Sequence, residues 1–142
     1  MLGLVKIPLI FFVRPRLLKI TNESVQVKIK LRRKTKNHLN SMYFGALAIG
    51  ADVAAGIYAF YCADKLGKPV SFAFKGMKVD FLKRAESAVI FECTEGAVIK
   101  EAVEKSLETG DRINRPVKVL AYNNQQEVVA EFVMEISVKV KG

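Results

Sequence analysis

The sequence is poor in the side chains that hold metal ions and build disulfide frameworks. Among its 142 residues are one histidine and two cysteines, Cys62 and Cys93, which lie inside apolar runs without CxxC spacing. A structural metal site needs a close cluster of such ligands, so we expect no metal centre. Both cysteines are expected to be reduced, buried thiols. Repeats, low-complexity tracts and linkers are also absent, which predicts a single domain over residues 1–142.

Long basic runs interleaved with aromatic residues are missing too, although the formal net charge is +9. Proteins that bind single-stranded nucleic acid use such surfaces, because bases stack on aromatic rings. The cations here alternate with apolar residues, as at Lys28, Lys30 and Arg32. We therefore expect either a basic solvated surface or a basic rim for a small phosphate-bearing ligand, and no nucleic-acid partner.

The N-terminal stretch MLGLVKIPLIFFVRPRLLKI is apolar but is interrupted by Lys6, Pro8, Arg14 and Pro15. These interruptions disfavour a membrane span. The stretch also lacks the positive start and the small-residue cleavage site of a secretory signal. We expect a helical arm over residues 1–20 that packs on the domain rather than on a membrane surface, in a cytoplasmic protein.

The most informative stretch runs from Asn37 to Ala63, NHLNSMYFGALAIGADVAAGIYAFYCA. From Met42 onward it carries one charge, Asp52, among apolar and small residues. A helix that is apolar on every face is buried in protein or in lipid, and a carboxylate at its centre argues against lipid. The sequence predicts a core helix over residues 41–64. Asp52 must then be paired, hydrogen-bonded or used for chemistry.

Alternating apolar residues predict a sheet around this helix. The alternating segments are residues 24–33, 70–82, 87–93, 116–123 and 128–140. In the second segment the alternation changes parity at Gly76, which predicts a β-bulge. Residues 97–109 show helical spacing instead and predict an additional amphipathic helix that ends before Gly110. The predicted fold class is α+β, with a curved antiparallel sheet wrapped around a long central apolar helix.

This topology, with the residues NHLNSMYFGALAIGAD, resembles the hotdog-fold thioesterases over residues 20–140, in particular the phenylacetyl-CoA thioesterase-like group and a related family of unassigned substrate. In that group an asparagine is followed by a glycine three residues on, a His-Gly-Gly triplet, and an acidic residue nine after the histidine. Here Asn37 matches the asparagine and Asp52 the acidic residue. Asn40 stands at the glycine position, and Tyr-Phe-Gly over residues 43–45 replaces the triplet.

The resemblance implies an acyl-CoA thioesterase that uses CoA only as part of its substrate and needs no other cofactor. The implied roles are water activation or nucleophilic attack for Asp52, an oxyanion-stabilising backbone N–H for Phe44, and side-chain donation or loop ordering for Asn37. In the group, a serine or threonine early in the following strand helps to hold the attacking water, and Ser71 lies at the matching place.

The residues expected to contact the substrate fall into two chemical classes. Apolar and small residues of the loop, the helix and the next strand would line an acyl channel, and basic residues would meet the CoA phosphates. The first class is Met42, Tyr43, Phe44, Gly45, Phe72, Phe74 and Met77. The second class is Lys65, Lys68, Lys83 and Arg84.

Spacing along the helix constrains this site. Phe44 and Asp52 are eight residues apart, about 12 Å along a helix axis. One thioester carbonyl and its water cannot contact both groups within one subunit. Two antiparallel helices across an interface would bring Phe44 of one chain beside Asp52 of the other. We therefore predict a composite site in a homodimer or a dimer of dimers.

Two alternatives stay open at this point. One is a non-catalytic acyl- or lipid-binding module of the same fold, favoured by the replaced triplet and the apolar arm. The other gives structural roles to Asp52, as a hydrogen-bonded core carboxylate, and to Ser71, as an ordinary strand serine. A hotdog dehydratase would need a catalytic histidine, and His38 is the only histidine in the chain. That class is therefore disfavoured.

Overall fold

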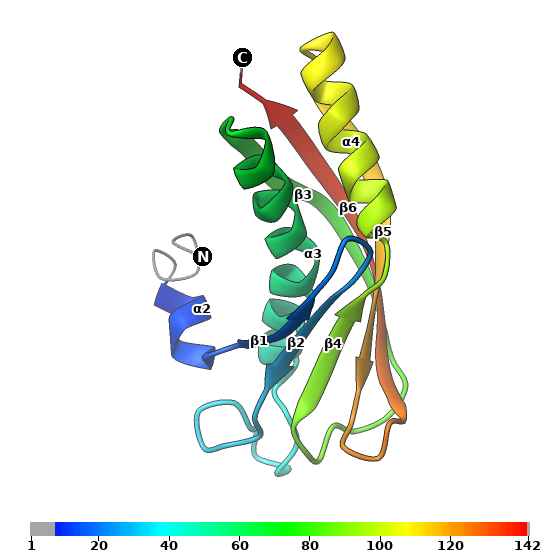
Figure 1. The fold of residues 1–142 in the computed structure, drawn as a ribbon. Helices are drawn as coiled ribbons and strands as arrows, with labels where there is room; N and C mark the ends of the chain where they lie inside the picture. Colours follow the sequence, from blue (N-terminus) through cyan, green and yellow to red (C-terminus); the bar gives the residue numbers. More distant parts are fainter. Residues whose placement is uncertain (1–7, 142) are drawn as a thin grey trace.

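The computed structural model describes residues 8–141, which form an α+β domain (Figure 1). Its elements are α2 (Pro8–Val13), β1 (Arg16–Ile20), β2 (Val25–Ile29), α3 (Phe44–Leu66), β3 (Val70–Phe81), β4 (Val89–Cys93), α4 (Gly96–Thr109), β5 (Ile113–Tyr122) and β6 (Val128–Val140). The six strands form one antiparallel sheet in the order β1-β2-β4-β5-β6-β3, and α3 packs on one face of it. The predicted fold class, a sheet wrapped around a central apolar helix, is confirmed.

The helix α3 forms the core of the domain. Thirteen of its 23 residues are buried, between Ala46 and Ala63. By length and composition α3 is apolar enough to cross a membrane, but 72% of its most apolar window is buried inside the fold. Its apolar surface packs against the sheet and against α4. The helix spans Phe44–Leu66 rather than the predicted residues 41–64. Gly67, whose backbone is left-handed (φ 66°), caps its last turn.

Residues 8–20 differ from the predicted helical arm. The helix α2 ends at Val13, and Arg16–Ile20 forms the edge strand β1 instead, paired with β2. Pro15 cannot continue a helix, and Arg14 before it has a left-handed φ of 56°. The backbone N–H and C=O groups at the free edge of β2 then pair with residues 16–20. The local sequence does not reveal this pairing. The part of the predicted arm before residue 8 lies outside the described residues.

The strand predictions are confirmed with changed bounds. The two largest changes are the end of β2 at Ile29 rather than at residue 33 and the start of β5 at Ile113 rather than at residue 116. The predicted bulge is present, because the β3–β6 register shifts between Phe74 and Gly76. The long strands β3 and β6, of 12 and 13 residues, bend together around α3.

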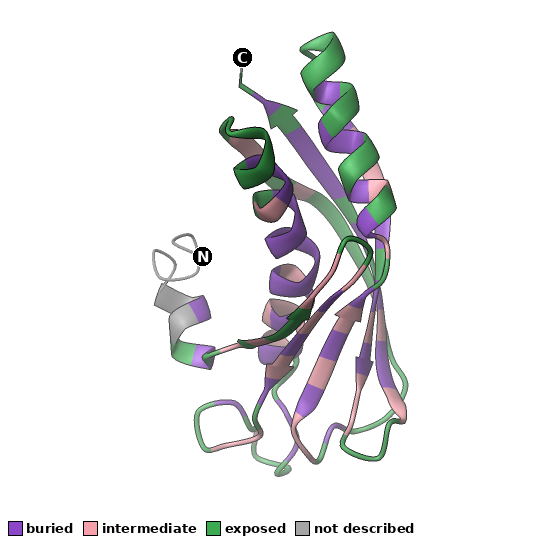
Figure 2. Cartoon of the chain, in the orientation of Figure 1, coloured by how far each residue is buried: buried purple, intermediate pink, exposed green. Residues whose placement is uncertain are grey.

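The strand β3 is an uncovered edge of the sheet. It pairs with β6 on one side only, and each of its 12 residues is exposed or half-buried (Figure 2). An unpaired edge of this length presents a row of free backbone N–H and C=O groups. The opposite edge, β1, has five residues and is interrupted by a bulge between Leu17 and Lys19.

Both cysteines are free and buried, as the sequence predicted. Burial raises the pKa of the Cys93 thiol to about 11, and burial also raises the pKa of Cys62. Because the thiolate is the reactive form, neither thiol is suited to be a nucleophile at neutral pH.

Two glycines of α3 predict opposite effects of the same substitution. A methyl group at Gly50 would overlap the fully buried ring of Phe91, whereas at Gly56 it would lie 3.4 Å from the ring of Phe72. We expect Gly50→Ala to lower the free energy of unfolding by roughly 1–3 kcal/mol through overpacking. Gly56→Ala should raise it by about 0.5–1 kcal/mol, because alanine favours a helix. Denaturant unfolding measures both, and equal effects would contradict the close approach at Gly50.

Candidate functional site

The loop before α3 is ordered by Asn37. Its side-chain oxygen accepts hydrogen bonds from the backbone N–H groups of Leu39 (2.9 Å) and Ser41 (3.1 Å). This is an Asx-type turn, in which a side chain takes the place of a backbone acceptor. The carbonyl of the buried Thr35 accepts from the N–H of Tyr43 at 2.8 Å, which fixes the entry into the helix. His38 is exposed in this loop.

The N-terminus of α3 presents two free backbone donors. Tyr43 is the N-cap residue, and no side chain caps the helix. Among the described residues, no acceptor binds the N–H groups of Phe44 and Gly45. The ring of Tyr43 lies over Gly45, where a larger residue would overlap it. Free N–H groups and the helix dipole favour negative charge at this point, so the helix start can bind an oxyanion.

The loop and the helix start border an open groove of about 410 Å³. The predicted site residues that line it are Asn37, Met42, Phe44, Lys83 and Arg84. Sequence reasoning missed Phe81 and Leu82, which also line it and are 51% and 53% exposed. The sequence signal that could have identified them is a pair of large apolar residues directly before two basic residues. A hydrogen bond of 2.7 Å from the Met42 N–H to the Ala85 carbonyl joins the two walls.

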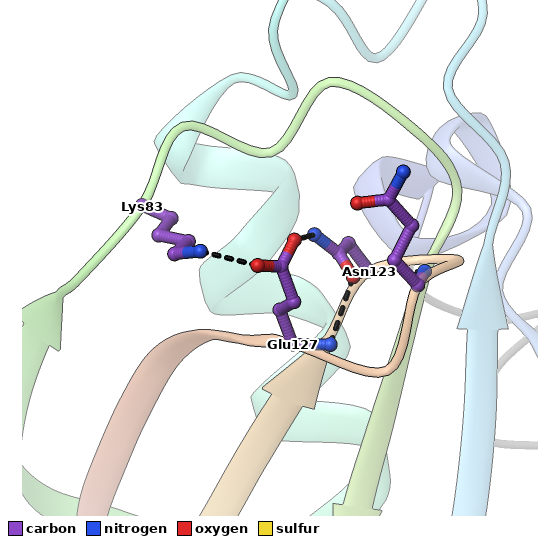
Figure 3. A network of polar contacts seen from close by, with 4 residues as sticks. Lys83, Asn123 and Glu127 are labelled. Carbon is purple, nitrogen blue, oxygen red and sulfur yellow. Dashed lines mark hydrogen bonds and ion pairs between the residues drawn. The ribbon is translucent and has the colours of Figure 1, made fainter.

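The two basic residues of the groove, Lys83 and Arg84, differ in their partners. The Lys83 ammonium donates to the Glu127 carboxylate, which also accepts from the Asn123 amide at 2.9 Å (Figure 3). These hydrogen bonds hold the pKa of Glu127 below its usual value. Arg84 has no carboxylate partner in the described part of the chain. Arg84 is therefore the cation of the groove that is free to meet a phosphate.

Asp52 lies at the middle of α3, on the side that faces β3. One of its carboxylate oxygens is 3.9 Å from the position that a Cβ at Gly56 would occupy, and the Phe72 ring borders the same position. The side chain is half-buried, and within residues 8–141 no ion pair balances its charge. Burial raises the pKa of Asp52. A partly desolvated, unbalanced carboxylate of this kind is typical of a functional site.

Aromatic side chains from β3 surround the Asp52 region. The rings of Phe72 and Phe74 meet edge to face, with centroids 4.9 Å apart, and Phe72 lies 6.1 Å from Phe60 of α3. Phe60 is 45% exposed. Phe60, Phe72 and Phe74 form an apolar surface beside the carboxylate, and this surface remains accessible in a single chain.

Ser71 is not brought together with Asp52. Its neighbour Phe72 contacts α3, so the pleat directs Ser71 to the opposite face of the sheet. There the Ser71 hydroxyl accepts a hydrogen bond from Arg112 at 3.0 Å. Within one chain the Ser71 hydroxyl is therefore directed away from Asp52, and the water-holding role expected for Ser71 stays a prediction. A displacement of one residue in a strand moves a side chain to the other face, and matching by sequence position does not resolve that difference.

Lys65 and Lys68, expected near the CoA phosphates, lie at the far end of α3 from the groove. The Lys65 ammonium lies 4.6 Å from the centroid of the Tyr61 ring. Among the described residues no group of three or more His, Cys, Asp or Glu side chains is placed to hold a metal ion. The candidate residues thus form two groups along α3, one at its start and one around Asp52.

The raised pKa of Asp52 predicts how stability depends on pH. The native carboxyl holds its proton more tightly than the unfolded one, whose pKa is 3.8. The free energy of unfolding therefore falls as pH rises from the unfolded pKa through the native pKa. In the Asp52→Asn variant this carboxyl is absent, so the fall does not occur. The free energy of unfolding of the variant minus that of the original protein should therefore be larger at pH 7 than at pH 4. Urea unfolding of both proteins at the two pH values measures the change, and a constant difference would contradict the shift.

Comparisons with known structures agree with this architecture. A Pseudomonas aeruginosa protein described as of unknown function and as "Probable Thioesterase" is 20% identical, with a TM-score of 0.82 over 96% of this chain and 89% of that chain. A Chlorobaculum tepidum protein of unknown function is 9% identical, with a TM-score of 0.83 over 97% and 89% of the two chains. A Haemophilus influenzae thioesterase is 9% identical, with a TM-score of 0.67 over 93% and 82%.

At these identities the likeness establishes the fold, and the hotdog fold expected from the sequence is confirmed. A search of curated proteins finds no match to this chain. The model of one protein family matches residues 2–138, which is nearly the whole sequence. The chain therefore belongs to the family described as Domain of unknown function (DUF4442).

Proposed function

We propose that this protein is a cytoplasmic acyl-CoA thioesterase that hydrolyses a fatty or aromatic acyl-CoA at a composite site between two subunits. The observation that carries the proposal is the half-buried carboxylate of Asp52, unbalanced by any described cation at the centre of a core helix. One of the structural relatives above is described as a thioesterase and another as a "Probable Thioesterase", which supports the same chemistry.

Thioester hydrolysis needs a base for water and donors for the carbonyl oxygen. Asp52 takes a proton from water as the water oxygen attacks the thioester carbon. The carbonyl oxygen becomes an oxyanion, which the N–H groups of Phe44 and Gly45 of the second subunit bind. The intermediate then expels the CoA thiolate, which takes up the proton held by Asp52. The free acid then leaves. Direct attack by the carboxylate, followed by hydrolysis of the mixed anhydride, would use the same groups.

The uncovered edge of β3 supports the second subunit. Pairing two copies of β3 about a two-fold axis would extend the sheet and satisfy the free backbone groups of both edges. Asp52 faces β3, so this pairing would enclose its carboxylate and the apolar surface around Phe72. The two α3 helices would then run antiparallel, with Phe44 of one subunit beside Asp52 of the other.

The chemistry of the two groups of residues suggests where the parts of the substrate bind. The acyl group would lie against the apolar surface of Phe60, Phe72 and Phe74. The CoA phosphates would meet Arg84 at the rim of the groove. Lys83 contributes less, because Glu127 already balances its charge.

The test is to follow thiol release from a panel of short, long and aromatic acyl-CoAs, together with sedimentation of the protein. We expect turnover on part of the panel and a dimer in solution. A dimer without turnover on any substrate would favour the second candidate, an acyl-binding module, which the Tyr-Phe-Gly replacement of the family triplet supports. A stable, fully active monomer would contradict the composite site.

A further inference from the structure

The net positive charge of this protein comes from one part of the chain. Residues 8–36 contain nine lysines and arginines and one acidic residue, Glu23. Residues 37–142 contain thirteen basic and thirteen acidic residues and are therefore neutral overall. Such asymmetry indicates an interaction surface rather than a general contribution to solubility.

The fold gathers these cations at the β1 edge of the sheet. Arg16 of β1 is the cross-strand partner of Lys28 of β2. The Arg32 guanidinium donates to the carbonyls of Phe12 (2.8 Å) and Val13 (3.0 Å), which joins the loop after β2 to the end of α2. The seven exposed cations, here called the basic surface, are Arg14, Arg16, Lys19, Lys30, Arg33, Lys34 and Lys36.

No described carboxylate forms an ion pair with the basic surface. The four ion pairs among residues 8–141 all use cations from Lys83 onward. Glu23, the one acidic residue of the segment, forms none of them. A concentrated set of unpaired cations attracts an anionic partner.

Exposed apolar side chains lie among these cations. Phe12 is 47% exposed and Leu18 is 44% exposed. The Lys34 ammonium lies 5.1 Å from the centroid of the Phe12 ring. Leu18 occupies the bulge of the edge strand, between Leu17 and Lys19. Apolar side chains surrounded by cations are typical of surfaces that enter the headgroup region of a bilayer.

We propose that the basic surface binds the headgroups of an anionic lipid membrane, with Phe12 and Leu18 entering the interface. Cations close to such a membrane act together, and the apolar side chains add the second contribution that stable peripheral binding requires. The sequence-based expectation placed the N-terminal arm on the domain and away from membranes. The proposal departs from that expectation because α2, β1 and the loop of residues 30–36 lie close together in the fold.

A nucleic acid is the other common polyanion, and the composition of the surface favours lipid over it. Binding of single strands uses several aromatic rings on which successive bases stack. Among the side chains that the structure describes in residues 8–36, Phe12 is the one exposed aromatic. The Lys34 ammonium already lies over its ring. Transfer of an aliphatic side chain such as Leu18 from water into the acyl interior of a membrane is favourable. A nucleic-acid phosphate backbone offers no apolar environment for it.

The position of the basic surface is compatible with the proposed dimer. The strands β1 and β3 are opposite edges of the sheet, so pairing through β3 leaves β1 uncovered. The loop of residues 30–36 continues into the loop of Asn37, and Thr35 is hydrogen-bonded to Tyr43 at the start of α3. Membrane binding would therefore place the groove at the helix start close to the lipid surface.

The experiment is flotation of the full-length protein with phosphatidylcholine vesicles, prepared with and without phosphatidylglycerol. The test variant combines Arg16→Gln, Lys19→Gln and Lys34→Gln. The control combines Lys105→Gln, Lys139→Gln and Lys141→Gln, which are exposed, lie elsewhere and change the net charge equally. Leu18→Ser tests the apolar contribution without a change in charge. Circular dichroism of each variant verifies that it is folded.

We expect binding to the anionic vesicles only. The test variant should bind roughly 10- to 100-fold more weakly, the control should change by less than about 2-fold, and Leu18→Ser should weaken binding about 5-fold. Equal binding to neutral vesicles, or equal losses in both triple variants, would overturn the proposal. Retention of single-stranded RNA that depends on the same three cations, without vesicle binding, would overturn it in favour of a nucleic-acid partner.

Discussion

Asp52→Asn is expected to reduce the turnover of acyl-CoA by about 10²–10⁴-fold, the range for loss of a general base. Asparagine keeps the shape of the side chain but cannot accept the proton of the attacking water. Its kcat on the best substrate of the panel measures the loss. Asp64→Asn is the matched control, because Asp64 is exposed near the end of the same helix. Its kcat should be unchanged.

The same substitution separates the catalytic role of Asp52 from a structural one. A structural carboxylate would be bound by donors, and its loss would destabilise the fold. For Asp52 we expect the opposite, since Asp52→Asn removes a partly desolvated charge and should stabilise the protein at neutral pH by about 0.5–2 kcal/mol. Lost turnover together with a raised Tm and an intact dimer supports the base. Lost turnover together with a lost dimer or a lowered Tm would assign a structural role.

Phe44→Pro is expected to lower kcat by about 10²–10³-fold, the range for loss of one oxyanion donor. Phe44 is the first residue of α3, and proline is accepted at that position of a helix. Tyr43 before it already has φ −59° and ψ 139°, a conformation that a following proline favours. The substitution therefore removes one N–H group while the helix is retained, which circular dichroism verifies. Phe44→Ala keeps the N–H and should lose less than about 10-fold.

Mixing the two inactive variants tests the composite site directly. In a heterodimer of Asp52→Asn and Phe44→Pro subunits, one of the two sites combines an intact Asp52 with an intact Phe44 N–H. Random reassociation of equal amounts should therefore restore about a quarter of the original activity. A site contained within one subunit would restore none. Reassociation is verified by separating differently tagged subunits.

Much of this fold is encoded locally and can be predicted from the sequence. The helix α3 was predictable because a long apolar stretch has no solvated face, so it must lie inside the sheet. The bulge at Gly76 was predictable because strand alternation has a period of two, and a change in parity requires an extra residue. Asp52 was recognisable as a functional candidate because a carboxylate in an apolar helix is costly wherever the helix packs.

Other features depend on which segments meet in three dimensions. β1 exists because the edge of β2 is free, and the opposite direction of Ser71 follows from the register of β3 against β6. Local sequence does not set either of these pairings. The basic surface likewise needs α2, β1 and the loop of residues 30–36 to come together. The sequence alone therefore determined the core helix, the alternation of the strands and the charge at the centre of the helix, because these are properties of short segments. The tertiary structure decided which side chains share a face and which charges remain unpaired, because both depend on contacts between residues far apart in the chain.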